Sequence, residues 1–226
     1  MNWFKVLLRP FAPPAQQPPP PSPYRLDDAL RLHLAPVLRA DGFKGSGRNY
    51  RRTVNDMVQV VNVQGSRWGG SFAINLGLHP LALPIRSNQP ADPGKINEID
   101  CAFRRRLRED EKDQWWSHDS AESAVVAVQA AAGVYQRVGR ALLERQSGPA
   151  APIWTLRPEE LDQASRRLEG FTLYTLREGA LASLMTQIRH ASGDVAAARA
   201  FARRARDEGL SAIDLAELEV LVGSIG

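Results

Sequence analysis

Polar side chains with regular spacing run along two consecutive stretches of alternating sequence. Asn62, Gln64 and Ser66 alternate with small or apolar residues, and Asn75 belongs to a second alternating run that begins at Phe72. Side chains two residues apart in a β-strand point to the same face of the sheet. Amide groups fixed in this way can hold a carboxylate, a phosphate or the backbone of a partner. The spacing therefore predicts a polar sheet face as the first candidate site.

Arginines are expected to extend this polar face. Arg104 and Arg106 fall on its side of a later strand predicted over Glu98 to Leu107, and Arg52 precedes the first amide run. Guanidinium groups bind carboxylates and phosphates with paired hydrogen bonds. The alternative is a solvated sheet face or an amide network that fixes strand register, and we favour it for most of the single residues. The apolar residues of the later strand, expected in the core, are Ile99, Cys101 and Phe103.

Tryptophans form the second candidate site. Trp68 lies in a glycine-flanked loop, and Trp115-Trp116 follows a segment of mixed charge. Tryptophan and arginine are common anchors of protein interfaces. In the competing interpretation, one tryptophan of the pair closes the core and the other covers the edge of the sheet. The sequence leaves both interpretations open for Trp68 and Trp115.

Enzymatic chemistry has the weakest support. The sequence contains no G-x-S-x-G or H-E-x-x-H motif and no clustered carboxylate pair. Ser66 would have to meet His79 or His118 in space, and nothing in the spacing favours this. The single cysteine and the four histidines show no ligand-type spacing. We therefore predict no catalytic residue, no metal site and no cofactor.

Two long helices are expected to support the sheet. Apolar residues at helical spacing from Leu26 to Leu38 predict the first helix, which Pro36 should kink or split and Asp41-Gly42 should end. Asp119 and Glu122 resemble a capping box that opens the second helix. The alanine-rich stripe of this second helix should let it lie close to the sheet.

The strands are expected to fold back as hairpins. Asn55-Asp56 predicts a tight turn because both residues tolerate positive φ. A loop centred on Trp68-Gly69 would place Asn62 opposite Asn75 and Gln64 opposite Ala73.

The chain divides into three parts by composition. Residues 1–23 are rich in proline and predict a linker, residues 24–148 predict an α+β domain, and residues 149–226 predict only helices. In the last part, helices are expected from Pro158, from about Thr172 to His190, after Asp194, and after Ser211 with Asp214 as a capping box. The predicted fold is an antiparallel sheet of about four strands, packed by two helices on one face and followed by a helical appendage.

Composition bounds the classes of function. The chain has 226 residues, of which 43% are hydrophobic, so it can bury a sizeable core. Its 29 Lys and Arg are nearly matched by 25 Asp and Glu, which gives only weak support for a polyanionic partner. The single cysteine favours a reducing cytoplasm. No apolar run is long enough to predict a signal peptide or a membrane span.

Several short motifs in a fixed order resemble a known family. They lie between about Leu26 and Arg145, and the most specific are Leu38-Arg39-Ala40-Asp41-Gly42-Phe43-Lys44, Tyr50-Arg51-Arg52, Val60-Val61-Asn62-Val63-Gln64-Gly65-Ser66, Phe72-Ala73-Ile74-Asn75-Leu76-Gly77, Asp100-Cys101-Ala102-Phe103-Arg104-Arg105-Arg106-Leu107 and Trp115-Trp116. In these residues the chain resembles the bacterial family called domain of unknown function 4304. The resemblance implies an α+β domain and brings no catalytic role with it.

These observations predict a non-catalytic protein-binding or interaction module of the bacterial cytoplasm, with another protein as its partner. The alternative is binding of nucleic acid or of a phosphorylated small molecule through the basic polar sheet face. No membrane contact is expected, and the sequence does not indicate an oligomeric state.

Overall fold

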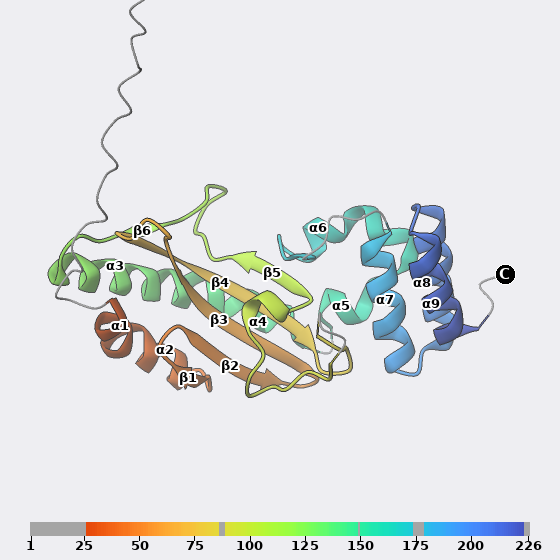
Figure 1. The fold of residues 1–226 in the computed structure, drawn as a ribbon, viewed down its shortest axis with the longest axis horizontal. Coiled ribbons are helices and arrows are strands. Elements are labelled where there is room, and N and C mark those ends of the chain that lie inside the picture. The colour runs from red at the N-terminus through yellow and green to blue at the C-terminus, as the bar shows by residue number, and fades with distance from the viewer. Residues whose placement is uncertain (1–25, 86–88, 149, 174–178, 224–226) are drawn as a thin grey trace, which may run out of the picture.

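A computed structural model describes residues 26–85, 89–148, 150–173 and 179–223. The predicted proline-rich linker lies outside these residues. Figure 1 shows the sheet and its long helices at one end of the molecule and the three C-terminal helices at the other. Among the described residues, no helix is both long enough and apolar enough to cross a membrane.

The elements follow one another in this order. The first helical rod consists of α1 (Leu26–Ala29), the π-helical turn η1 (Leu30–Leu34) and α2 (Ala35–Ala40). The strands before the second rod are β1 (Lys44–Ser46), β2 (Asn49–Val54), β3 (Met57–Gly65), β4 (Ser71–Pro80), β5 (Phe103–Arg106) and β6 (Trp116–Ser117), with the 3-10 turn η2 (Glu98–Asp100) before β5. The second rod consists of α3 (Ala121–Val134), the π-helical turn η3 (Tyr135–Gly139) and α4 (Arg140–Arg145). The remaining elements are α5 (Pro152–Thr155), η4 (Pro158–Gln163), α6 (Ala164–Arg167), β7 (Thr172–Leu173), α7 (Ala180–Ala191), α8 (Val195–Asp207) and α9 (Ala212–Val222).

All strand pairs in the sheet are antiparallel, so the predicted α+β class is confirmed. The order is β1-β2-β3-β4-β5-β7, and β6 pairs with β4. The prediction of about four strands was too low, because β1, β6 and β7 have only two or three residues and show no readable alternation. The C-terminal part is not wholly helical, since Thr172–Leu173 pairs with β5 and the expected helix begins only at Ala180.

The predicted strand register is confirmed. Asn62 lies opposite Asn75, and Gln64 lies opposite Ala73. The turn between β2 and β3 is also where the sequence placed it, because Val54 pairs with Met57 and Asn55 has a φ of 52°. A two-residue turn with positive φ matches the twist of the flanking strands.

One face of the sheet shares a single hydrophobic core with both helical rods. Phe72, Ile74 and Leu76 project into this core from β4 as predicted, and each is fully buried. Four alanines of α3 face the same core and bring the helix backbone close to the strands: Ala124, Ala127, Ala131 and Ala132. Burial of this apolar surface is the main force that holds the two rods on the sheet.

Both rods show how single residues shape a helix. Pro36 has no N–H to donate, and the turn before it is π-helical, with the Ala35 N–H donating to the Leu30 carbonyl five residues back. The second rod begins one residue later than expected. Its N-cap is Ser120, whose side chain accepts from the Ser123 N–H, and Asp119 and Glu122 do not form the predicted box.

The second face of the sheet is covered at one end. Residues 81–85 and 89–102 fold over it and form a smaller apolar cluster in which Cys101 is buried with Val58, Val60 and Ile96. Cys101 is therefore interior, as predicted, but in a core separate from the main one. Ile99 is 53% exposed, contrary to the prediction, because residues 98–100 form a 3-10 turn that interrupts the strand alternation.

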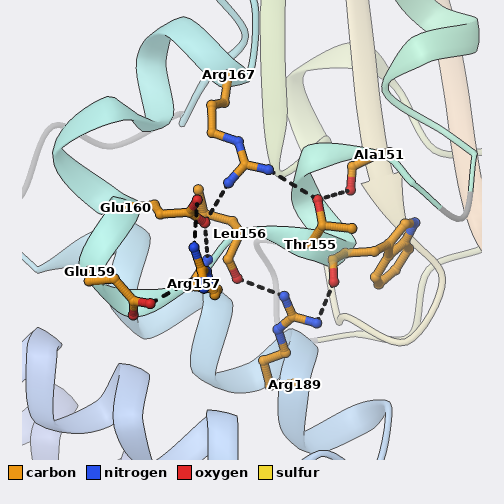
Figure 2. A network of polar contacts seen from close by, with 9 residues as sticks. Ala151, Thr155, Leu156, Arg157, Glu159, Glu160, Arg167 and Arg189 are labelled. Atoms are coloured by element: carbon orange, nitrogen blue, oxygen red, sulfur yellow. Dashed lines mark hydrogen bonds and ion pairs between the residues drawn. The ribbon is translucent and has the colours of Figure 1, made fainter.

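The last two helices, α8 and α9, begin at the predicted caps. Asp194 accepts from the Ala197 N–H, and Ser211 accepts from the Asp214 N–H. Figure 2 shows how α7 is joined to the end of α5. Arg189 donates to the carbonyls of Trp154 at 2.5 Å and Leu156 at 2.7 Å. These contacts fix α7 along one of its sides.

Candidate functional site

Four amide side chains cross the open end of the second sheet face in one hydrogen-bonded row, which we call the amide ladder. Asn62 donates to Asn49 at 2.9 Å, and Asn75 donates to Asn62 at 3.2 Å and to Gln64 at 3.0 Å. The row joins β2, β3 and β4. Sequence reasoning missed Asn49, although its place opposite Asn62 follows once the β2–β3 turn is known.

Arg106 continues the ladder onto β5. Its guanidinium donates to Gln64 at 3.3 Å, lies 3.7 Å from Asp113 and stacks 4.8 Å from the centre of the Trp115 ring. The Trp115 indole N–H in turn donates to Asp113 at 2.9 Å. One guanidinium nitrogen of Arg106, Nη1, is buried without a hydrogen-bond partner among the described residues. Arg106 is thus held from three sides, as predicted for a member of the polar face.

Arg104 lies on the same face but at the covered end. Its guanidinium forms an ion pair with Glu98, whose side chain is only 4% exposed. Glu98 belongs to the turn that covers the sheet, so this pair joins the covering segment to β5. Sequence reasoning placed Arg104 correctly and missed its partner, because the expected strand ran through Glu98.

Arg52 is not part of this face, contrary to the prediction. It pairs with Gln59 and points to the side of the sheet covered by the helical rods. There it donates to Gln59 at 2.7 Å and to the Asp41 carbonyl at 2.5 Å, and it lies over the Phe43 ring. A displacement of one residue along a strand moves a side chain to the opposite face, which explains the error.

Trp68 stands at the tip of the β3–β4 hairpin and is 78% exposed. The Ser66 hydroxyl accepts from the Trp68 N–H at 3.1 Å, and the Arg67 guanidinium lies 4.6 Å from the ring centre. Ser66 therefore shapes the loop that presents the tryptophan. An exposed tryptophan next to an arginine is a combination enriched at protein interfaces.

Trp115 and Trp116 point to opposite faces of the sheet. Trp116 is buried and stacks on Phe72 with ring centres 5.6 Å apart, whereas Trp115 is 38% exposed beside Arg106. Trp116 pairs with Phe72, only four residues after Trp68 in the chain. Both exposed tryptophans therefore lie at the same end of the sheet. We call Trp68, Trp115 and their two arginines, Arg67 and Arg106, the tryptophan surface.

Ser66 and His79, one of the two pairs considered for catalysis, do not meet. Ser66 lies at the tip of the β3–β4 hairpin and His79 at its opposite end, where it pairs with Val58. One ring nitrogen of His79 contacts the Leu83 carbonyl at 3.1 Å, and the other accepts from the Ala102 N–H at 3.2 Å. Burial lowers the pKa of His79, so its neutral form is favoured.

Burial also shifts the pKa values of two other side chains that could take part in chemistry, Cys101 and His118. Burial raises the pKa of the Cys101 thiol far above its usual range, which removes the thiolate needed of a nucleophile. The pKa of His118 is lowered, mainly by burial and then by the positive charge of Arg48.

The fold and the surface together define a class of protein: an α+β domain whose antiparallel sheet is packed by helices on one face and bears a row of amides on the other. Residues 34–144 match the family model of DUF4304, a domain of unknown function. The match over that segment confirms the resemblance seen in the sequence. No curated protein and no solved structure matches the chain.

Proposed function

We propose that the domain is a non-catalytic protein-binding module that contacts its partner through the tryptophan surface. The observation that carries this proposal is the 78% exposure of Trp68 at the tip of a hairpin anchored in the sheet. Rigid aromatic side chains contribute large contact area at low entropic cost, and arginine next to tryptophan is typical of interface hot spots.

The charges of the same sheet face argue against the alternative of phosphate or nucleic-acid binding. Arg104 pairs with Glu98, and Arg106 contacts Asp113 and Gln64. Arg51, also on this face, donates to the Ile96 carbonyl and to Asn97. A polyanion would have to displace these internal acceptors before it gained a contact. These three arginines are therefore less available to phosphate than free cations would be.

The test replaces Trp68 with a photo-reactive phenylalanine analogue in cells that produce the protein naturally. Illumination should give one adduct of defined mass that contains a second protein. The matched control carries the same analogue at Val126, which is 66% exposed on α3 and lies away from the tryptophan surface. This control should give no such adduct.

Once the partner is known, Trp68→Ala should weaken binding by about 2 kcal/mol, because a central tryptophan commonly contributes this much to an interface. Affinity should depend only weakly on salt. Retention of nucleic acid that falls steeply with rising salt, with no protein adduct at residue 68, would instead establish the alternative.

A further inference from the structure

A second, unassigned site lies where the sheet meets the C-terminal helices. A cleft of about 590 Å³ separates the loop after β4 and the residues before β5 from one face of α7 and one face of α9. We call it the junction cleft. Its volume is in the range of small-molecule sites, and such sites often form between two structural units. It shares no residue with the tryptophan surface.

The walls of the junction cleft are mainly apolar. They include Leu83 and Ala102 on the side of the sheet, Leu184 on α7, and Leu218 and Leu221 on α9. Leu83 and Leu218 are also packed into the main hydrophobic core, which supports the walls from behind. An aliphatic or aromatic body would therefore lose its water shell on entering the cleft, which is favourable.

Polar side chains in the cleft are available to a ligand. Ser183, Gln187 and His190 line it from α7, and Glu217 lines it from α9. None of these four side chains takes part in a hydrogen bond or ion pair within the part of the chain that the structure describes. By helical spacing, Ser183, Gln187 and His190 lie on a different side of α7 from Arg189, which donates to the carbonyls of Trp154 and Leu156. A few free polar groups in an apolar cleft are the usual pattern of a ligand site.

The charge of the cleft favours one kind of ligand. Asp100 lines it from the sheet side and Glu217 from the helical side. Among the described residues that line the cleft, there is no lysine or arginine. A positive group in the cleft would gain attraction from both walls, whereas a carboxylate or phosphate would be repelled.

We propose that the junction cleft binds a small amphipathic molecule that carries an ammonium group on an aliphatic body. Leu184, Leu218 and Leu221 contact the body, and Glu217 with Asp100 attracts the ammonium. This site is independent of the proposed protein contact, and either can fail without the other.

Titration of the full chain with three eight-carbon probes tests the proposal. Octylammonium should bind in a saturable manner at one site per chain, as measured by calorimetry below the micellar range. Octanoate should bind at least about tenfold more weakly because the carboxylates of the cleft repel its negative charge. Equal or tighter binding of octanoate would overturn the charge assignment, and absence of octylammonium binding would overturn the site. Octanol is the neutral reference.

Variants locate the binding and keep the test valid if one of them misfolds. Glu217→Gln should weaken octylammonium about fivefold and leave octanol unchanged. Leu184→Trp, or Gln187→Trp on the same helix face, should fill the cleft and so abolish binding of octylammonium and of octanol. Val220→Trp is the matched control because Val220 is 89% exposed on α9 and does not line the junction cleft. Binding that persists in both filled variants, with their circular dichroism unchanged, would place the probe elsewhere.

Discussion

Val60 and Asn62 lie two residues apart on β3 and point to the same side of the sheet, yet their surroundings are opposite. Val60 is fully buried in the small cluster with Ile96 and Cys101. Asn62 is half-buried and exchanges hydrogen bonds with the amides of the neighbouring strands. The second face of the sheet thus has a dry end and a polar end within one pair of strands.

The difference between the two ends comes from what covers them. Residues 81–85 and 89–102 fold over the dry end, and Arg51 fixes them there by donating to the Ile96 carbonyl and to Asn97. Within the described part of the chain the polar end has no comparable cover, and the amide ladder satisfies its hydrogen bonds instead. The comparison teaches that strand alternation determines which face a residue occupies, whereas the covering segment determines whether that face is core or surface.

The largest effect is expected for Arg104→Ala, which removes the cation at the boundary of the dry end. Its partner Glu98 is only 4% exposed and would remain as a buried carboxylate without an ion pair. Loss of one member of a buried pair costs about 3 kcal/mol. Urea unfolding should show this decrease in the free energy of unfolding.

The control combines Arg104→Ala with Glu98→Gln, which removes the uncompensated charge as well. The double variant should recover a large part of the lost stability. If the single variant is as stable as the wild type, Glu98 is hydrated and the dry end is not sealed at this position.

The second prediction concerns packing inside the dry end. A methyl group added at Gly77 would lie 2.7 Å from the Cys101 sulfur and 3.1 Å from its Cβ. Gly77→Ala should therefore reduce stability by about 2 kcal/mol through overpacking. Thermal and urea unfolding measure the change.

Cys101→Ala provides the matched background because it removes the sulfur that the new methyl group would meet. Gly77→Ala should be less harmful in this background than in the wild type. Equal costs in both backgrounds would mean that the backbone at Gly77, and not the contact with Cys101, sets the requirement for glycine.

The register of the sheet could be predicted because local rules fix it. The Asn55-Asp56 turn and the loop around Trp68 each determine a hairpin, and a hairpin determines every cross-strand pair that follows it. The position of the amides and of Arg104 and Arg106 on one face then follows from alternation. The same reasoning failed for Arg52, which was assigned to a face before the pairing of β2 was known.

Other features depend on contacts between distant parts of the chain and left no periodic signal. The cover of the dry end comes from an irregular segment, and the junction cleft combines residues from β4 to α9. The ion pair of Arg104 with Glu98 is hidden because a 3-10 turn replaces the first residues of the expected strand. Each of these requires the tertiary fold before it can be recognised.

A moderate effect is expected for Asn75→Ala at the polar end. Asn75 is 5% exposed and donates to both Asn62 and Gln64. The two acceptors are less buried, so water can replace the lost donor, and the cost should be about 1 kcal/mol. A loss near 3 kcal/mol in urea unfolding would show that the amide ladder is sealed from solvent in the same way as the dry end.

The smallest effect on stability is expected for Arg106→Ala, which completes the comparison with Arg104 on the same strand. The ion partner of Arg106 is Asp113, 3.7 Å away and 61% exposed in its side chain, so the pair contributes little. The free energy of unfolding should fall by about 0.5 kcal/mol, while Trp115 loses its stacking partner and its emission shifts to longer wavelength. Trp115→Phe serves as the background in which that shift disappears. Equal destabilisation by Arg104→Ala and Arg106→Ala would mean that both ends of the face are structural. The tryptophan surface would then not be an open binding site.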